Sequence, residues 1–306
     1  MISFEFFFGE KTGRVKKMTI KHVIGLDIGG TKTTIARYDA TTWKAENTET
    51  LSTDAVQGMP MVTQKILELI TKLRTPHTTA IGVGIAGLVQ SADGVLLRAP
   101  HIAQSENVPL QAVLQSGCHL PVYVNNDAHC FALAEALHGA GKGRGTVLGI
   151  TIGTGVGGGI VCNGKLFHGA HGFAGEFGHM LLFPGKPPYP TESNRGEVEE
   201  FISGTALGKR CAQAEAPADY LSGAACEFLR PDVLREIVWI CASLSFAFDP
   251  SIIIFGGSAG RALKPHIRAL KKELQQWIPF LQPPELAVAK REDAGVLGAA
   301  LLTAND

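Results

Sequence analysis

Three observations on the sequence predict an α/β protein with two similar lobes. Segments typical of buried strands alternate with segments of helical periodicity along most of the chain. The stretch VIGLDIG at 23–29 recurs without gaps as VLGITIG at 147–153, with Val, Gly, Ile and Gly at the same steps. Each copy is followed by a Gly/Thr turn and a returning strand, so we expect the two lobes to open in the same way.

The first half of the chain contains apolar, β-branched segments that predict strands. These strands are expected at 22–29, 33–39, 80–87 and 121–127. Helices are expected at about 58–73, in a segment that ends near residue 117, and at 128–140. Because the strands alternate with the helices, the fold class is α/β.

The second half begins with glycine-rich strands at 146–153 and 158–167, the latter broken by an Asn163-Gly164 hairpin signal. An apolar helix is expected at 237–248, and a strand from Ser251 ends in a small-residue turn. A closing helix is expected at 293–302. Three glycine turns thus follow strands directly, at the strand ends where open α/β sheets bind ligands.

Length and composition limit the classes of function. The 306 residues are enough for two domains. Lys plus Arg and Asp plus Glu number 28 each, so no overall field attracts nucleic acid or an anionic membrane. The longest apolar stretch, at 237–248, is shorter than the roughly 20 residues of a membrane span. Partners are therefore expected to be small molecules or another subunit.

The cysteines and the N-terminal segment bear on the compartment. Six cysteines are scattered without a C-x-x-C pair, mostly in apolar surroundings, and are expected to be reduced thiols of a cytoplasmic protein. Residues 1–17 lack the features of a signal peptide and are interpreted as an upstream extension, with Met18 as the natural start.

The stretch TIGTGVGGGI at 151–160 contains a literal G-x-G-x-x-G match. A dinucleotide site needs a helix after these glycines, whereas here a second strand follows, which disfavours a dehydrogenase. Taken alone, the turn is consistent with a phosphate-binding site or with a ligand-free hairpin. The related turn after 23–29 favours phosphate binding.

Several ordered motifs together resemble the ROK family of bacterial sugar kinases. They are LDIGGTKT at 26–33, NNDAHCFALAE at 125–135, GITIGTGVGGGI at 149–160 and HGFAGEFGHM at 171–180. The resemblance implies the two-lobed ribonuclease-H-like fold of the actin and hexokinase superfamily, with the active site in the interlobe cleft. It also implies a cytoplasmic homodimer that uses ATP and Mg²⁺ to phosphorylate a hexose or N-acetylhexosamine.

This resemblance also suggests the lobe limits. An extension is expected at 1–20, an N-terminal lobe at 21–125 closed by the C-terminal helix 293–304, and a C-terminal lobe at 126–292.

The resemblance assigns the general base to Asp127 and a sugar contact to Asn126. Phosphoryl transfer to an alcohol needs such a carboxylate beside the attacking hydroxyl. From the residues alone, Asp127 is equally a helix N-cap. The residues implied to bind the nucleotide are Asp27, Gly29, Gly30, Thr31, Lys32, Gly153, Thr154, Gly155, Gly157, Gly256 and Gly257. For the last two, a plain glycine turn after a buried strand is the alternative.

Further sugar contacts are implied for Gly87, Glu176, His179 and Glu199, with ordinary loop hydrogen bonds as the alternative for Glu176 and His179. Glu200, beside Glu199, is expected to be a surface residue. His101 stands where the family's kinases usually carry a sugar-binding Asn, so its side chain is a candidate contact, but the particular hexose is not predicted.

The sequence departs from the family pattern in the segment before Glu199. Most ROK members bind a structural zinc with the counterpart of His179 and three cysteines in C-x-C-G-x-x-G-C. This chain has no cysteine between those two residues, so one ligand remains where a closed site needs four. We therefore expect no zinc. Four prolines between residues 184 and 190 are expected to stiffen the loop instead.

Two other functions remain open beside the kinase. Some ROK relatives are repressors that carry a DNA-binding helix-turn-helix before the first glycine motif, and the 24 residues before Gly25 do not have that pattern. The missing zinc cysteines and His101 are consistent with a non-catalytic sugar binder. Asp27, Asp127 and both glycine turns argue against such a binder.

Overall fold

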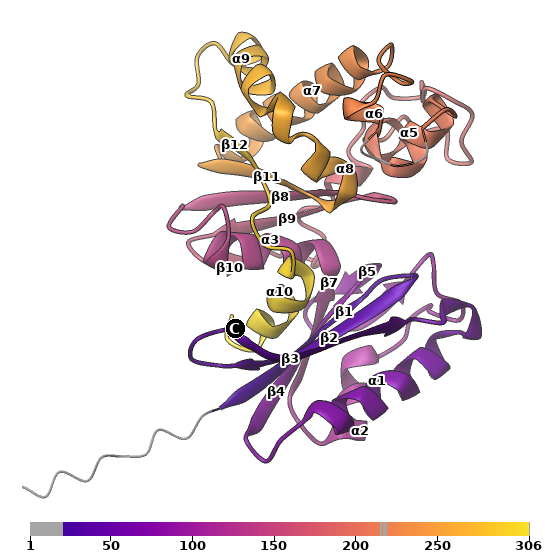
Figure 1. Ribbon diagram of the computed structural model, residues 1–306, viewed down its shortest axis with the longest axis vertical. Helices are drawn as coiled ribbons and strands as arrows, with labels where there is room; N and C mark the ends of the chain where they lie inside the picture. Colours follow the sequence, from indigo (N-terminus) through magenta and orange to yellow (C-terminus); the bar gives the residue numbers. More distant parts are fainter. Residues whose placement is uncertain (1–20, 215, 217–218, 306) are drawn as a thin grey trace, which may run out of the picture.

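Two five-stranded sheets, one above the other, form the framework of the protein (Figure 1). The computed structural model describes residues 21–214, 216 and 219–305, so the expected extension at 1–20 lies outside the described residues. In spatial order, the first sheet contains β3 (Ala45–Ser52), β2 (Lys32–Asp39), β1 (His22–Ile28), β4 (Thr78–Ile85) and β7 (Val122–Asn126). The second contains β10 (Lys165–Leu166), β9 (Val156–Cys162), β8 (Thr146–Ile152), β11 (Ile252–Gly256) and β12 (Glu285–Val288).

The predicted repeat corresponds to equivalent strands in the two sheets. β1 pairs antiparallel with β2 and parallel with β4, while β8 pairs antiparallel with β9 and parallel with β11. Both central strands end at a glycine turn that leads into the antiparallel partner. The expected α/β class with two similarly opened lobes is therefore confirmed.

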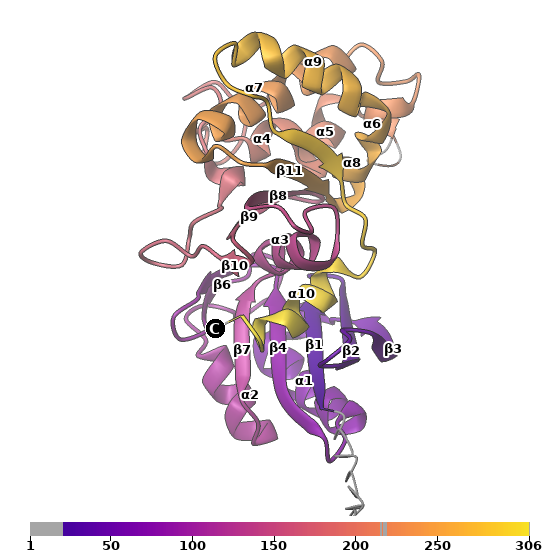
Figure 2. The ribbon, with the colours of Figure 1, turned by 90° about the vertical axis from the view of Figure 1, so that its left-hand side faces the viewer.

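Helices lie on both sides of each sheet. α1 (Met59–Leu73) and α2 (Leu110–Cys118) cover the outer face of the first sheet, whereas α3 (Asp127–His138) and α10 (Ala294–Leu302) lie between the two sheets (Figure 1, Figure 2). The outer helices of the second lobe are α4 (Glu199–Ile202), α5 (Gly204–Arg210), α6 (Asp219–Ser222), α7 (Arg230–Phe248), α8 (Gly257–Ala262) and α9 (Ile267–Trp277). The remaining elements are β5 (Leu88–Gln90), β6 (Val95–Arg98), η1 (Ala55–Gln57), η2 (Phe177–His179) and η3 (Lys264–His266).

The closing helix α10 touches its neighbours through backbone because glycines face it. A Cβ on Gly25 of β1 would lie 2.2 Å from the carbonyl oxygen of Val296, and one on Gly82 of β4 would lie 1.7 Å from that of Ala299. On the other side of α10, a Cβ on Gly298 would lie 1.8 Å from the carbonyl oxygen of Cys130 in α3. Because α10 lies against β1 and β4, we propose that the first lobe consists of 21–125 together with 293–304, and the second of 126–292.

A hydrophobic core is shared between the two sheets. It contains Cys130 and Leu133 of α3 and Val296 of α10, together with Val23 of the first sheet and Ile254 of the second. Two further cores lie outside the sheets, one under α1 and α2 and the other among the outer helices of the second lobe. The shared core fixes α3, and with it the chain at residues 126–127.

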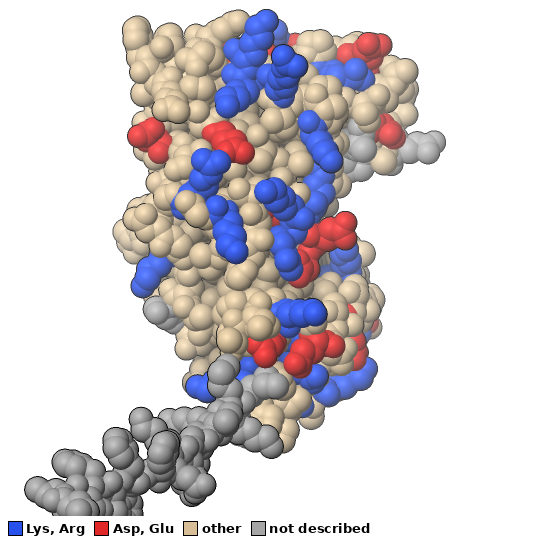
Figure 3. Space-filling view, turned by 60° about the vertical axis from the view of Figure 1, so that its left-hand side comes forward, with Lys and Arg blue, Asp and Glu red and all other residues tan. Residues whose placement is uncertain are grey.

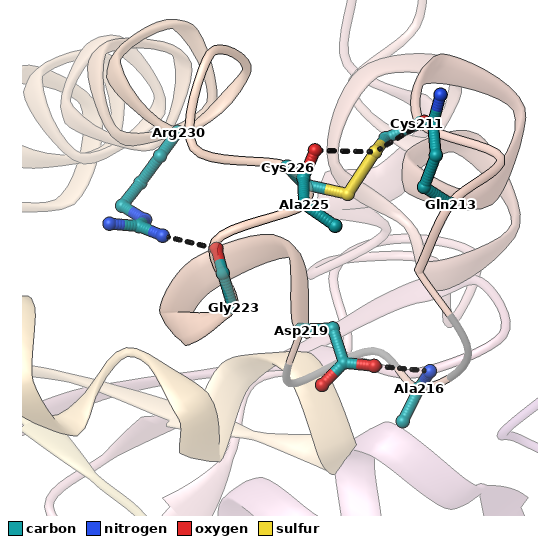
Figure 4. Close-up of a disulfide and its surroundings, with 8 residues drawn as sticks. All are labelled: Cys211, Gln213, Ala216, Asp219, Gly223, Ala225, Cys226 and Arg230. Atoms are coloured by element: carbon teal, nitrogen blue, oxygen red, sulfur yellow. Dashed lines mark hydrogen bonds between the residues drawn. A yellow bond between two sulfur atoms is a disulfide. The ribbon is translucent and has the colours of Figure 1, made fainter.

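Two of the six cysteines do not agree with the expectation of reduced thiols. Cys211 and Cys226 form a disulfide between the end of α5 and the segment before α7 (Figure 4). Their Cα atoms are 6.0 Å apart, within the usual range for a disulfide. They are 15 positions apart in the sequence, so no local C-x-x-C pattern indicated the pairing. Nearby, the Arg230 guanidinium donates to the Gly223 carbonyl at 2.7 Å.

Two further features of the described residues are the length of the apolar helices and the distribution of surface charge. Within residues 21–214, 216 and 219–305, no helix is long and apolar enough to cross a membrane. On the face drawn in Figure 3, Lys and Arg side chains are spread over both lobes, and acidic side chains lie among them in the upper and the lower part. This distribution accompanies a formal net charge of zero.

Candidate active site

Four of the predicted site residues directly follow the carboxyl ends of strands. Gly29 follows β1, Asp127 follows β7, Gly153 follows β8 and Gly257 follows β11. Within each sheet the parallel strands end at the same edge, which brings these segments towards the junction of the two lobes.

The first glycine turn is closed by a hydrogen bond from the Gly29 N–H to the Lys32 carbonyl, at 3.0 Å. Thr53, which sequence reasoning missed, holds the turn from outside: its hydroxyl donates to the Gly29 carbonyl at 2.7 Å, and its N–H donates to the Thr31 carbonyl at 3.0 Å. A Cβ on Gly30 would lie 2.6 Å from Cβ of His101. The structure therefore places His101 directly against the first glycine turn.

The second glycine turn is closed by a hydrogen bond from the Gly153 N–H to the Gly155 carbonyl, at 2.9 Å. The start of α5 supports it, since the Gly204 N–H donates to the Gly153 carbonyl at 2.7 Å and the Thr205 hydroxyl donates to the Thr154 carbonyl at 2.8 Å. A Cβ on Gly153 would meet no heavy atom of the described residues within 4 Å. This turn is thus rigidly held and has open space on the Gly153 side.

Gly157 has a packing role as well as a place in the turn motif. A Cβ there would lie 2.6 Å from Cβ of Ala128, in the first turn of α3. The glycine allows β9 to approach α3 closely and so fixes the turn relative to the start of α3.

Asn126, not Asp127, caps α3. The Asn126 Oδ1 accepts hydrogen bonds from the N–H groups of Ala128 and His129, at 2.8 and 3.2 Å, and its Nδ2 donates to the Gly87 carbonyl at 2.9 Å. Asp127 is the first residue of the helix, and its Oδ1 accepts from the Ala128 N–H at 2.9 Å. The capping role considered for Asp127 thus belongs mainly to its neighbour.

The side-chain amide of Asn126 and the carbonyl of Gly87 are hydrogen-bonded to each other. A Cβ on Gly87 would also lie 2.6 Å from the Arg98 carbonyl, so Gly87 is a point of close approach to the loop that carries His101. These contacts join β4, α3 and that loop into one wall of the candidate site.

The two aspartates lie close enough to interact electrostatically. Burial, and then the neighbouring charge of Asp127, raise the pKa of Asp27 to about 7, although Lys32 opposes the shift. Burial also raises the pKa of Asp127, against the effect of its backbone hydrogen bonds. Gly295 of α10 leaves room for the Asp27 carboxylate, since a Cβ at that position would lie 2.2 Å from its Oδ2.

Glu176, His179 and Glu199 form the other wall of the candidate site. Burial raises the pKa of Glu176, His179 opposes the shift, and the charges of Asp127 and Glu199 increase it. Glu176 therefore lies near enough to Asp127 and Glu199 to interact electrostatically with both. Glu199 Oε2 accepts a hydrogen bond from the Val156 N–H at 2.7 Å. A Cβ added to Gly155 would lie only 2.5 Å from the same oxygen. Glu199 therefore contacts the second glycine turn directly.

Gly256 and Gly257 are required by packing. A Cβ on Gly256 would lie 2.4 Å from the Phe131 ring, and one on Gly257 would lie 2.4 Å from the Ile152 carbonyl. Gly257 also has φ 73°, which favours glycine. The plain structural role is thus sufficient to explain both residues, and a nucleotide contact there stays a prediction.

The comparison with protein families matches the ROK family model over residues 23–306. The chain belongs to the ROK family. It is 28% identical to the glucokinase of Thermotoga maritima (91% of this chain and 96% of the relative) and 28% identical to the N-acetyl-D-glucosamine kinase of a Yersinia pseudotuberculosis strain (91% and 97%). The solved structure of a ROK family glucokinase from Streptomyces griseus with glucose and AMPPNP superposes with a TM-score of 0.73, at 29% identity, covering 92% of this chain and 98% of that one.

Several residues of the candidate site are suited to bind a nucleotide and a magnesium ion. Mg²⁺ takes oxygen ligands, and Asp27 and Asp127 supply carboxylate oxygens in a buried setting where a cation would relieve their repulsion. The open side of Gly153 leaves space beside a turn of backbone amides. These residues therefore fit a metal-bound polyphosphate.

The expectation for Glu200 is wrong, and the expectation for zinc stays untested. Glu200, expected at the surface, is buried and accepts four hydrogen bonds from residues 191–197. Residues 21–214, 216 and 219–305 contain no group of three His, Cys, Asp or Glu side chains that could hold a metal ion. The expectation that zinc is absent stays a prediction. Glu197, bonded to His179, was also missed because no sequence motif marked it.

Proposed function

We propose that this ROK protein is an ATP-dependent kinase that phosphorylates a hydroxyl group of a hexose or an N-acetylhexosamine, with Asp127 as general base. The observation that carries the proposal is the position of Asp127 at the start of α3, where it interacts electrostatically with Asp27 of β1 and with Glu176. The names of the curated relatives, glucokinase and N-acetyl-D-glucosamine kinase, support the same activity.

Asp127 would accept the proton of the attacking hydroxyl. Its Oδ1 is held by the Ala128 N–H, so the carboxylate is fixed at the end of the helix and Oδ2 can take the proton. Because burial raises its pKa, the carboxylate is a stronger base than an exposed aspartate. The group must be ionised to accept the proton, so kcat is expected to rise with pH through its pKa.

The nucleotide would be held by the two glycine turns, with Gly256 and Gly257 towards the adenosine. Bound magnesium would supply charge neutralisation to the triphosphate, and Asp27 is the residue proposed to hold it. Lys32, exposed beside the first turn, would add positive charge near the phosphates.

The sugar would lie between Asp127 and the wall formed by Glu176, His179 and Glu199. His101 of the first lobe, which packs on Gly30, and Asn126 at the start of the second lobe, which is hydrogen-bonded to Gly87, flank this space. A cytoplasmic homodimer is part of the proposal, as is the absence of nucleic acid and membrane partners. The Cys211–Cys226 disulfide is the observation that stands against a reducing compartment.

The test is ADP release with a panel of hexoses, amino sugars and N-acetylhexosamines, followed by the Asp127→Asn variant with the best sugar. We expect turnover to fall by about 10²–10⁴-fold while ATP binding is retained, because the amide keeps the shape and cannot accept the proton. Near-normal kcat in this variant would refute Asp127 as the base. Absence of turnover with every sugar, accompanied by sugar binding, would favour the non-catalytic sugar binder.

A further inference from the structure

The loop between His179 and α4 is organised around one carboxylate, that of Glu200. Its Oε1 accepts hydrogen bonds from the hydroxyls of Thr191 and Ser193, the latter at 2.7 Å. Its Oε2 accepts the backbone N–H groups of Gly196 and Glu197, at 2.6 and 2.9 Å. All four donors lie within the nine residues that precede Glu200, so the carboxylate closes this segment upon itself.

The surroundings keep Glu200 in its charged form. Burial alone would raise the pKa of Glu200, but the hydrogen bonds from the loop outweigh burial and lower it. Hydrogen bonds to an ionised acceptor are roughly twice as strong as those between neutral groups. A single side chain can therefore order a loop that has no regular secondary structure.

The other side of the loop is held by backbone contacts. The Leu182 N–H donates to the Gly196 carbonyl at 2.8 Å, and the Val198 N–H donates to the Met180 carbonyl at 2.8 Å. At Gly196 the backbone has φ 74°, and a Cβ would lie 1.8 Å from the Phe183 carbonyl. The segment 195–198 is thus fixed between residues 180–183 and the Glu200 carboxylate.

Glu197 connects the loop to the candidate site. Its Oε2 accepts a hydrogen bond from His179 Nδ1 at 3.0 Å, and its Oε1 lies 2.8 Å from an Arg195 guanidinium nitrogen, an ion-pair distance without hydrogen-bond geometry. Among the residues that the structure describes, only Glu197 hydrogen-bonds the His179 ring, which leaves Nε2 for a ligand. Glu199, in contrast, turns away from the loop towards Val156.

We propose that Glu200 is a positioning residue for the acceptor sugar: it fixes the segment 191–197, this segment holds Glu197 against His179, and Glu197 orients the imidazole with Nε2 towards a sugar hydroxyl. The inference deepens the proposed function and rests on it in one respect, that His179 contacts the sugar. Glu200 itself touches neither the sugar nor the nucleotide.

The experiment compares three variants of the full chain. Glu200→Ala removes the acceptor of all four hydrogen bonds. Glu200→Gln keeps an oxygen for the two backbone N–H groups, while its amide nitrogen can donate to the hydroxyls of Thr191 and Ser193. Glu192→Ala is the matched control, because Glu192 is an exposed glutamate of the same loop.

Sugar KM, ATP KM and kcat are measured for each variant. We expect Glu200→Ala to raise the sugar KM by about tenfold, the equivalent of losing one well-placed hydrogen bond, with ATP KM unchanged. Glu200→Gln should recover most of this loss, and Glu192→Ala should match the wild type. A folded Glu200→Ala protein with wild-type sugar KM overturns the proposal, as does an equal rise in ATP KM.

Amide hydrogen exchange is a second measurement, which needs no enzymatic activity. It also decides the question if Glu200→Ala fails to fold. Ser193→Ala and Thr191→Val each remove one hydroxyl that donates to Glu200, together with its weaker link to the backbone N–H of Arg195 or Asn194. Both should speed amide hydrogen exchange at Gly196 and Glu197 relative to Glu192→Ala. Unchanged exchange in both variants overturns the ordering role of Glu200. If the wild type phosphorylates no sugar, the proposed function fails, and exchange still decides the loop part of the inference.

Discussion

Replacing Asp27 by Asn should stabilise the metal-free protein although it removes a residue proposed to serve activity. The Asp27 side chain lies at the end of β1, against Gly295 of α10. Burial first, and then Asp127, raise its pKa from 3.8 to about 7, with only partial compensation by Lys32. The folded protein therefore holds this carboxylate at a cost whenever it is ionised.

The sign and size of the effect follow from the shifted pKa. Because the folded pKa is above the unfolded one, the folded protein binds more protons between about pH 4 and pH 7, and stability falls as the pH rises through this range. A shift of about three pKa units corresponds to at most about 4 kcal/mol. Residual solvent and relaxation reduce this, so we expect about 2 kcal/mol at pH 8 and well under 1 kcal/mol at pH 4.5.

Thermal unfolding with a chelator at the two pH values measures the difference between variant and wild type. Asp27→Asn should raise Tm by roughly 3–6 °C at pH 8 and hardly at pH 4.5. Asp39 is a control of opposite sign, since hydrogen bonds from the backbone of Thr42 and Thr41 lower its pKa and its contribution is lost as the pH falls. An equal Tm difference at both pH values, or a less stable Asp27→Asn at pH 8, would refute the reasoning.

Three further predictions concern the sugar side, the metal and the disulfide. Glu199→Ala should raise sugar KM by about one to two orders of magnitude and leave nucleotide Kd unchanged, because a hydroxyl held by a carboxylate contributes roughly 0.5–3 kcal/mol; an equal loss of nucleotide affinity would show that the contact of Glu199 with the second glycine turn, and not a sugar contact, is its main role. Elemental analysis should find no stoichiometric zinc, and activity should survive chelation and re-addition of Mg²⁺; one zinc per chain would contradict this. Thiol titration of the unfolded, unreduced protein should count the four free cysteines, against six after reduction. Cys211→Ser should lower stability by up to about 3 kcal/mol, since the bond closes a loop of about 15 residues, and six thiols without reduction would exclude the disulfide.

The strands that position the site could be predicted because they are mostly apolar. β1, β4, β8 and β11 are each central in a sheet and almost entirely buried, and their sequences are correspondingly uniform. β3 was missed because AENTETLS is polar and mostly exposed at the edge of the first sheet. An edge strand of this kind derives its position from the pairing with β2, which leaves no hydrophobic pattern to recognise.

The candidate site was predictable where a motif carried it and not where contacts did. Asn126 and Asp127 are both good capping residues, and only the backbone geometry decides which one precedes the helix. Glu200 was expected at the surface because a glutamate beside another glutamate is usually solvated. Its four donors lie in an irregular loop, and no periodicity or spacing indicates that such a loop returns to the side chain that follows it.

The core shared by α3 and α10 makes the two lobes one cooperative unit. Both sheets contribute to that core: Val23 and Ile254 come from different sheets and belong to the same cluster as buried residues of α3 and α10. Glycines at 25, 82 and 298 bring backbone against backbone there: a methyl group added at Gly25 or Gly82 would push α10 away from the first sheet, and one added at Gly298 would push α10 away from α3 of the second lobe. Either lobe expressed alone would expose this surface to water, and loosening it by heat or mutation would unfold both lobes in one transition. A substitution in α10 far from any ligand would then reduce activity through the fraction of folded protein rather than through the chemistry.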